Sequence, residues 1–228
     1  CMGVFPRRVV VTGYPRNDIY YNLDKYCFFE GLSGKLRSIA QKNKLILYAP
    51  TFRDSYSVEF FPFKDFELSR LDKYLTDLGA VMLLRPHDND ASLTGCLKAL
   101  SGQSDRLFYC GSEVLPDIQQ IIPLLSCIVT DYSSIFIDGL ILDIPCVFLP
   151  YDLEKYIEDR GLVYDYDMLA PGVKPKTYDD FLLSISSVLL GNDDFSKNRM
   201  FAKKMFNSHS DGRACQRAVS AIREMLSR

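Results

Sequence analysis

The alternation of short apolar, β-branched runs with longer helix-like stretches is the feature that most constrains the fold of this chain. The continuous apolar run at 44–50 suits a strand buried on both faces, and 65–79 has apolar residues at helical spacing with a glycine at its end. Such alternation is typical of an α/β protein with a mainly parallel sheet covered by helices on both faces. The same pattern predicts further strands at 8–13, 80–88, 106–110, 127–131 and 145–150, and helices at 91–100, 117–125, 134–142, 179–190, 194–206 and 212–226. The segment 164–176 is irregular and is expected to be a surface loop.

Length and charge exclude several classes of protein. With 228 residues the chain can bury a substantial core, and 27 basic against 29 acidic residues leave a net charge of −2. The chain has no overall basic excess of the kind that would indicate a nucleic-acid partner. The apolar runs are far shorter than the roughly 20 residues of a membrane-spanning helix, and no signal-peptide pattern opens the chain.

The cysteines indicate a reducing compartment. There are seven, an odd number, they are scattered without a CxxC pair, and several lie inside apolar runs. Cysteine in such a run behaves as a small hydrophobic residue. We therefore expect a cytoplasmic protein with reduced core cysteines, no disulfide framework and no metal site. The cysteines are Cys1, Cys27, Cys96, Cys110, Cys127, Cys146 and Cys215.

Polar clusters follow three of the predicted strands, at the point where each strand ends. They are Thr51-Phe52-Arg53-Asp54, Arg85-Pro86-His87-Asp88 and Asp131-Tyr132-Ser133-Ser134. In parallel α/β sheets, ligands bind beyond the carboxyl ends of the strands. The coincidence of the clusters at one edge indicates a binding site there.

The first two clusters supply cations. Arg53 offers a planar fork of donors suited to phosphate or carboxylate, and Thr51 adds a hydroxyl. A surface ion pair between Arg53 and Asp54 is the alternative. His87 emerges two residues after Arg85, which favours a functional role over a structural one for this histidine.

The third cluster carries the strongest signal. Ser133 or Ser134 can cap the helix expected from 134, although capping needs only one of the two serines. The start of that helix also offers free N–H groups to an anion. Together with the cations of the other clusters, the junction predicts a diphosphate site, and Asp131 of the same cluster is a further candidate for substrate contact. No GxGxxG or GxxxxGK[ST] motif is present, which argues against dinucleotide-dependent oxidoreductases and ATP-binding phosphate loops.

Two acidic residues and a second histidine complete the set of candidates. Asp138 lies one turn after Ser134 and is expected on the same helix face, where it orients a serine, meets a ligand hydroxyl or ties the helix to its neighbours. Asp211 begins a predicted capping turn and is a candidate for ligand contact. For His209 we favour a structural role.

Several stretches together resemble the CDP-glycerol glycerophosphotransferase family, whose members build poly(glycerol phosphate) chains of wall teichoic acids and related capsule polymers. The resemblance covers nearly the whole chain. The stretches are TGYPRND (12–18), LILYAPTFRD (45–54), LLRPHD (83–88), VTDYSSIFIDGLILDIPCVF (129–148), YDLEKYIEDRGLVYDYDMLAPG (151–172) and SDGRACQRAV (210–219).

The resemblance implies a GT-B architecture, in which two Rossmann-like domains face each other across a cleft. This chain resembles the C-terminal, donor-binding half, with 1–30 as a remnant of the N-terminal domain and crossover and 31–228 as the Rossmann-like domain. The tryptophan-histidine-glycine block of the family's first domain has no counterpart, because the chain contains no tryptophan. Asp88 stands where the family has proline after the histidine.

The resemblance also implies roles for the candidates. His87 and Arg85 are expected to be catalytic and to contact the donor pyrophosphate, with Ser133, Ser134 and the helix start binding the same group. Thr51 and Arg53 are expected to line the phosphate or cytidine side, and no cofactor is implied.

The implied reaction moves glycerol phosphate, or a related polyol phosphate, from CDP-glycerol or a similar donor to a polymer or lipid-linked acceptor, and releases CMP. The expected partners are the N-terminal domain and the inner face of the plasma membrane, and no nucleic acid. A GT-B glycosyltransferase using a nucleotide sugar and a donor-binding module without turnover remain alternatives.

Overall fold

A six-stranded, all-parallel sheet forms the centre of the protein in a computed structural model, which describes residues 9–25 and 28–227. The strands are β1 (Lys44–Tyr48), β2 (Ala80–Leu84), β3 (Leu107–Tyr109), β4 (Leu125–Thr130), β5 (Cys146–Phe148) and β6 (Gly172–Val173). Their order is β3-β2-β1-β4-β5-β6, so the chain builds the sheet outward from β1 in one direction and then from β4 in the other. The predicted α/β class with a mainly parallel sheet is confirmed.

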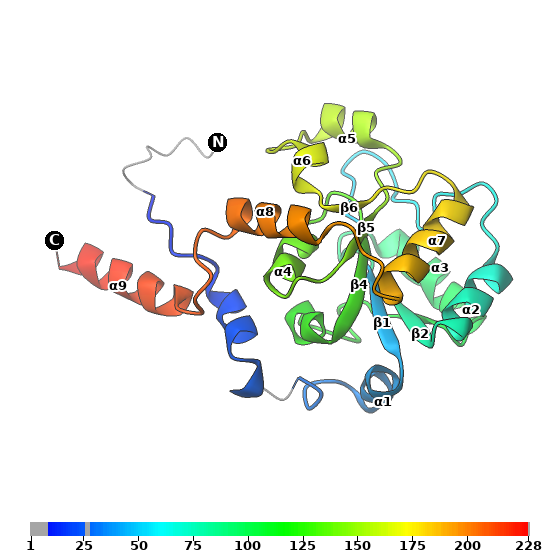
Figure 1. Ribbon diagram of the computed structural model, residues 1–228, viewed down its shortest axis with the longest axis horizontal. Coiled ribbons are helices and arrows are strands. Elements are labelled where there is room, and N and C mark those ends of the chain that lie inside the picture. The colour runs from blue at the N-terminus through cyan, green and yellow to red at the C-terminus, as the bar shows by residue number, and fades with distance from the viewer. Residues whose placement is uncertain (1–8, 26–27, 228) are drawn as a thin grey trace.

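Helices cover both faces of the sheet, as the layers in Figure 1 show. The helices of the described residues are α1 (Gly34–Lys42), α2 (Leu68–Asp77), α3 (Ala91–Gly102), α4 (Ile135–Ile141), α5 (Leu153–Asp159), α6 (Tyr166–Leu169), α7 (Tyr178–Leu189), α8 (Ser196–Phe206) and α9 (Ala214–Leu226), the last of which lies beside the sheet. Helices α4 and α8 lie on one face of the sheet, and α2 and α7 lie on the other. Short 3-10 turns are η2 (Pro15–Tyr21), η3 (Leu23–Lys25), η4 (Ile118–Gln120) and η5 (Ile122–Leu124).

Continuous apolar strands produce two cores because successive side chains point to opposite faces. In β1, Leu45 and Leu47 enter the core beneath α4, whereas Ile46 and Tyr48 enter the core beneath α2 and α7. All four side chains are at most 1% exposed, which is why this run carries no polar residue.

The prediction of a strand at 8–13 is wrong for residues 9–13, the part of it that the structure describes, because these residues form no strand. The run Val9–Val11 is exposed and has no neighbouring strand, so its β-branched composition alone does not make it part of a sheet. Side chains from the C-terminal region contact backbone carbonyls of the segment 9–13 instead. Arg217 Nε donates to Thr12 O at 2.8 Å, and His209 Nε2 lies 3.1 Å from Val11 O.

Two other predicted segments differ from the structure. The helix expected at 117–125 is a pair of 3-10 turns, and Pro123, which has no N–H to donate, lies in the second. The surface loop expected at 164–176 is wrong, because it contains α6 and the edge strand β6. Gly172 permits this pairing, since an added Cβ would lie 2.1 Å from the Cys146 carbonyl oxygen of β5.

The cysteine prediction holds for part of the set. Cys110, Cys127 and Cys146 are buried and free, and burial raises the pKa of all three thiols. Cys96 and Cys215 are free but exposed, so the expectation that they are core residues is wrong. Cys1 and Cys27 lie outside the described residues.

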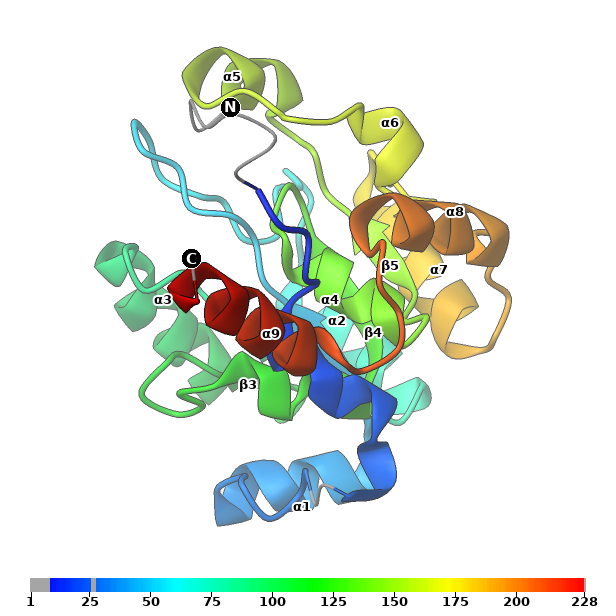
Figure 2. The same cartoon turned by 90° about the vertical axis from the view of Figure 1, so that its left-hand side faces the viewer.

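The N-terminal segment pairs with the C-terminal helix beside the sheet, as Figure 2 shows from the side of α9. Asp18 in η2 caps α9: its carboxylate accepts hydrogen bonds from the N–H groups of Ala214 and Cys215 at 2.9 and 2.8 Å. These bonds hold the Asp18 pKa below its ordinary value against the opposing effect of burial. The division of the chain at residue 30 stays a prediction.

Candidate functional site

The carboxyl edge of the central strands is where the fold offers a crevice. β1 connects toward β2 and β3, whereas β4 connects toward β5 and β6, so the direction of the connections reverses between β1 and β4. Ligands of such sheets bind beyond the strand ends at this reversal. The polar clusters follow β2, β1 and β4, which are neighbours in the sheet.

A hollow of about 240 Å³ opens at this edge. It brings together three of the predicted site residues, Arg85, His87 and Ser133. The other candidates, Thr51, Arg53, Asp131, Ser134, Asp138 and Asp211, do not line it. The lining is completed by Ala49, Pro50, Pro86, Asp88, Ile118 and Ile135.

Arg85 supplies a fixed positive charge. Its Nη1 donates to the carbonyl oxygens of Cys110 and Leu115 at 3.2 and 2.5 Å, and the side chain is half-buried. Two carbonyls after β3 therefore hold one corner of the guanidinium. A planar fork held in this way suits bidentate contact with phosphate oxygens.

His87 is exposed at the rim of the hollow, with its ring 5.6 Å from that of Phe52. The backbone N–H of Asn89 donates to His87 Nδ1 at 3.2 Å. Because Nδ1 accepts, the neutral ring carries its proton on Nε2. His87 can therefore offer Nε2–H to an anion.

The two serines lie at the start of α4 in different ways. The N–H of Ile135 approaches Ser133 Oγ at 3.4 Å, whereas Ser134 occupies the capping position without a side-chain cap. Ser134 is exposed and Ser133 is half-buried beside the hollow. Because α4 has only seven residues, the side chain of Arg85 supplies more positive charge here than the helix end does.

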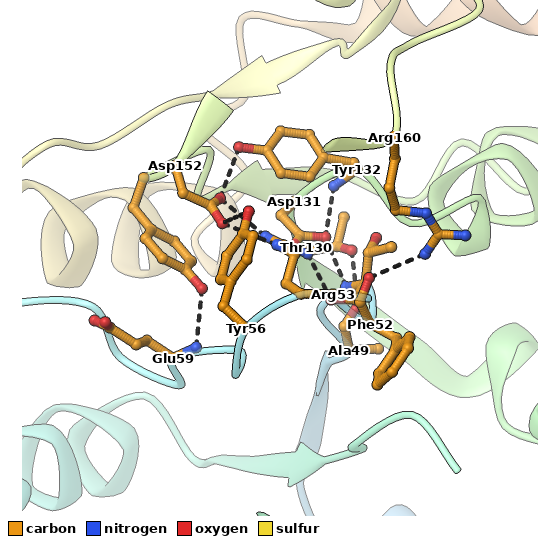
Figure 3. A network of polar contacts seen from close by, with 12 residues as sticks. Ala49, Phe52, Arg53, Tyr56, Glu59, Thr130, Asp131, Tyr132, Asp152 and Arg160 are labelled. Atoms are coloured by element: carbon orange, nitrogen blue, oxygen red, sulfur yellow. Dashed lines mark hydrogen bonds and ion pairs between the residues drawn. The ribbon is translucent and has the colours of Figure 1, made fainter. Parts of the chain in front are cut away.

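Arg53 lies under the site, in the buried network of Figure 3. It is 1% exposed, and it donates to both carboxylate oxygens of Asp152 at 2.9 Å and to Asp131 Oδ2 at 2.8 Å. Its remaining nitrogen donates to Thr51 O at 2.5 Å. The guanidinium is thus bonded within the protein, and the geometry does not favour direct ligand contact. The alternative pair with Asp54 is wrong too, because Asp54 pairs with Arg160 at 3.2 Å.

The network joins the loops that follow β1, β4 and β5. Tyr56 and Tyr132 donate to Asp152 at 2.8 and 3.0 Å, and Asp131 accepts from the N–H of Thr51 at 2.8 Å. Burial works to raise the pKa of Asp152, but the bonds from Arg53 and the tyrosines outweigh it and hold that pKa below its ordinary value. The loop bearing Ser133 is therefore anchored from below.

Asp138 ties α4 to its neighbours. This buried carboxylate accepts hydrogen bonds from Arg16 at 3.0 Å, Asn17 at 3.0 Å and Gln119 at 3.1 Å. Of the roles expected for Asp138, the structure matches the one that links the helix to other elements. Ser134 is exposed, whereas Asp138, four residues later, is 2% exposed, and their shared helix face stays a prediction.

Asp211 and His209 lie beside α9, not at the hollow. Asp211 pairs with Arg217 at 2.8 Å and accepts from the N–H of Arg213 at 3.1 Å, but the first free N–H groups of α9 are capped by Asp18 and not by Asp211. His209 contacts only the Val11 carbonyl among the hydrogen bonds of the described residues. This contact agrees with the structural role favoured for His209.

Sequence reasoning missed Ile118 and Asp152. Ile118 lines the hollow from a 3-10 turn, for which no local pattern gave a signal. Asp152 directly follows Tyr151 in the loop after β5 and lies within the family-like stretch 151–172, so its position in a loop after a strand could have identified it. Among residues 9–25 and 28–227, no cluster of three or more His, Cys, Asp or Glu side chains is arranged to hold a metal ion.

Comparison with known proteins gives relatives of one kind. The chain is 30% identical over 224 residues to the teichoic acid poly(ribitol-phosphate) polymerase of Bacillus spizizenii, covering 96% of this chain and 34% of the relative. It is 25% identical to the teichoic acid glycerol-phosphate primase of Bacillus subtilis, covering 99% of this chain and 54% of the relative.

The structure superposes on the wall teichoic acid polymerase TagF with a TM-score of 0.71 and 26% identity, over 98% of this chain and 54% of the other. A UDP complex of MnaA from S. aureus, with a TM-score of 0.54 and 18% identity, shares the fold alone. The chain thus spans about a third of the length of the first of these two relatives and about half of the length of the second. The model of one family, CDP-Glycerol:Poly(glycerophosphate) glycerophosphotransferase, matches residues 2–224, and the chain belongs to that family.

Proposed function

We propose that this chain is the donor-binding half of an enzyme that transfers glycerol phosphate, or a related polyol phosphate, from a CDP-activated donor to a growing polymer or lipid-linked acceptor. The observation that carries the proposal is the hollow in which Arg85, His87 and Ser133 converge at the carboxyl edge of the sheet. Polyol-phosphate polymerases and a primase among the relatives support the substrate class. A TagF structure described with CDPG supports the donor.

In this proposal the donor pyrophosphate occupies the hollow. An acceptor hydroxyl attacks the β-phosphorus, the bond from that phosphorus to the bridging oxygen breaks, and CMP leaves. Arg85 and the Nε2–H of His87 stabilise the charge that develops on the phosphate oxygens, which is the main catalytic task in phosphoryl transfer. The acceptor proton passes to a base from the N-terminal half.

The other candidates take supporting parts. Thr51 and Ser134, which neighbour lining residues, are proposed to contact the donor. Arg53 and Asp131 act by holding the loops of the hollow in place, and Asp138 by fixing α4 beside it. Ligand contact by Asp211 finds no support in its position beside α9.

We also propose that the enzyme works at the inner face of the plasma membrane, in contact with its N-terminal half and a lipid-linked acceptor. The chemistry of the acceptor motivates this placement. In the part of the chain that the structure describes, no helix has the length and apolarity needed to cross a membrane.

Calorimetric titration of CDP-glycerol into the purified chain tests the proposal. We expect His87→Ala, Arg85→Ala and the double change Ser133→Ala/Ser134→Ala each to weaken binding at least about tenfold, or about 1.4 kcal/mol. Arg70→Ala is the matched control, because it removes an exposed arginine on α2 that pairs with Asp179. Unchanged affinity in the site variants, or tighter binding of a UDP-sugar than of CDP-glycerol, refutes the assignment.

A turnover assay separates the half-enzyme from a complete one. We expect the chain alone to bind CDP-glycerol without releasing CMP, and release to begin when an N-terminal half is added. CMP release by the isolated chain would contradict the assignment of the base to the other half.

A further inference from the structure

A second, larger hollow opens at the same edge of the sheet, beyond the ends of β5 and β6. Its volume is about 520 Å³, and it shares no lining residue with the first hollow. Residues 149–151 follow β5 and residues 174–176 follow β6, so both segments reach it at the carboxyl ends of their strands. Its lining includes Phe63, Pro150, Tyr151, Asp167, Lys174 and Lys176.

The walls of this hollow are aromatic and proline rings held in place by the core. Phe63 packs against Tyr178 and Phe181 of α7, with ring centroids 5.6 and 5.3 Å apart. The Tyr151 hydroxyl accepts a hydrogen bond from the Glu59 N–H at 2.9 Å. Flat faces of this kind suit the carbon chain of a polyol rather than a compact, fully hydrated ion.

Two lysines give the hollow its charge. Lys174 Nζ donates to Ala170 O at 3.2 Å and lies 5.4 Å from the centre of the Tyr166 ring, so its ammonium is held at the wall. Its ion partner, Asp167, is 3.8 Å away with a side chain that is 86% exposed, against 27% for Lys174. Water therefore weakens that pair. Lys176 is exposed, and the lining thus includes two lysines and one aspartate.

The surroundings of Lys174 destabilise its ammonium. Burial lowers the pKa of its ammonium, and the pairing with Asp167 does not fully compensate. A bound anion would restore the lost charge stabilisation. Perturbed lysines in a cavity of this kind are candidates for ligand contact.

The second hollow is linked to the first through the Arg53 network. Tyr151 forms a wall of the second hollow, its ring lies 5.8 Å from the Arg53 guanidinium, and the next residue, Asp152, bonds that guanidinium. Arg53 also bonds Asp131, two residues before Ser133. One network thus holds a wall of each hollow on the same edge of the sheet.

We infer that the hollow lined by Lys174 and Lys176 binds one phosphodiester of the acceptor chain together with its adjoining polyol carbons. This inference rests on the proposed function and deepens it, because it assigns an acceptor subsite to the half that binds the donor. A phosphodiester carries one negative charge, which matches two lysines offset by one aspartate, and its polyol carbons match the ring-lined walls. The donor diphosphate is assigned to the first hollow, where two backbone carbonyls hold Arg85 and where His87 and Asp88 also line the wall.

Calorimetry with a synthetic glycerol phosphate oligomer of defined length tests this subsite on the same chain. We expect Lys174→Ala/Lys176→Ala to weaken oligomer binding at least about tenfold while CDP-glycerol affinity stays unchanged. Lys197→Ala/Lys204→Ala, which removes two exposed lysines of α8, is the charge-matched control and should bind the oligomer like the wild type. Lys176→Ala alone changes an exposed position and should weaken oligomer binding by about threefold. This result does not depend on whether the fold tolerates a change at the half-buried Lys174.

Two further ligands identify the source of the anion. Inorganic phosphate and glycerol 3-phosphate should each bind more weakly than the oligomer, because neither reaches the ring-lined walls with a polyol on both sides. Equal affinity for inorganic phosphate, absence of oligomer binding, or equal oligomer affinity in the wild type and the Lys174/Lys176 variant overturns the inference. Failure of the proposed function would give a different result: the wild-type chain would bind the oligomer but not CDP-glycerol.

Discussion

Replacement of Arg53 tests whether the ion network beneath the first hollow is a structural core. Arg53→Met keeps much of the side-chain volume but leaves the carboxylates of Asp131 and Asp152 without their cation. The side chains of the three residues are 0%, 1% and 9% exposed, so water cannot replace the lost bonds. Removal of one partner from a buried ion pair costs about 3–5 kcal/mol.

The free energy of unfolding, measured by urea titration at pH 7, should therefore fall by about 3–5 kcal/mol in Arg53→Met. Arg70→Met is the matched control, because the Arg70–Asp179 pair is exposed, with side chains 39% and 64% accessible. Its loss should cost at most about 1 kcal/mol. Arg53→Lys should recover only part of the stability, since one ammonium cannot reproduce the paired bonds to Asp152 and the bond to Asp131.

The pH dependence of the deficit gives a second, independent readout. Without Arg53, burial raises the folded-state pKa of both carboxyls above the unfolded value of about 3.9. A carboxyl with a raised folded pKa destabilises the protein when it is ionised, so the deficit is largest at neutral pH and shrinks as pH falls. In the wild type the lowered pKa of Asp152 has the opposite sign: its contribution is present above the unfolded pKa and is lost as pH falls through the folded one. A deficit below about 1 kcal/mol at pH 7, or one that does not shrink as pH falls toward the unfolded pKa of about 3.9, would refute the reasoning.

Two further predictions concern residues away from the hollow. Asp138→Ala should lower the free energy of unfolding by about 2–3 kcal/mol in urea titration, because it leaves buried donors of Asn17 and Gln119 unpaired. Asp138→Asn keeps an acceptor oxygen and should cost less. Equal losses in the two variants would contradict this account. His209→Ala should leave the calorimetric affinity for CDP-glycerol unchanged, because His209 contacts the Val11 carbonyl beside α9, and a large loss of affinity would contradict its structural role.

Local sequence patterns were sufficient to predict the parallel sheet and the edge at which the candidate site lies. The continuous apolar runs at 44–50 and 127–131 are typical of strands that are covered on both faces of a sheet. A polar cluster at the end of such a strand lies at the carboxyl edge of the sheet. Local patterning was sufficient here because it acts over a few neighbouring residues. It misjudged 9–13, where β-branched residues lack a neighbouring strand, and 164–176, where β6 depends on pairing with β5.

Which polar side chains face the hollow depends on tertiary contacts between distant parts of the chain. Arg53 and Arg85 both follow strand ends and look alike in sequence, yet Arg53 turns inward because Asp152, 99 residues away, and Asp131 bond it there. Arg85 stays at the hollow because its partners are two backbone carbonyls that hold one corner of its guanidinium. The partners of a buried charge come from distant parts of the chain, so they are fixed by packing and not by any local pattern. The second hollow likewise exists only because β5 and β6 end side by side.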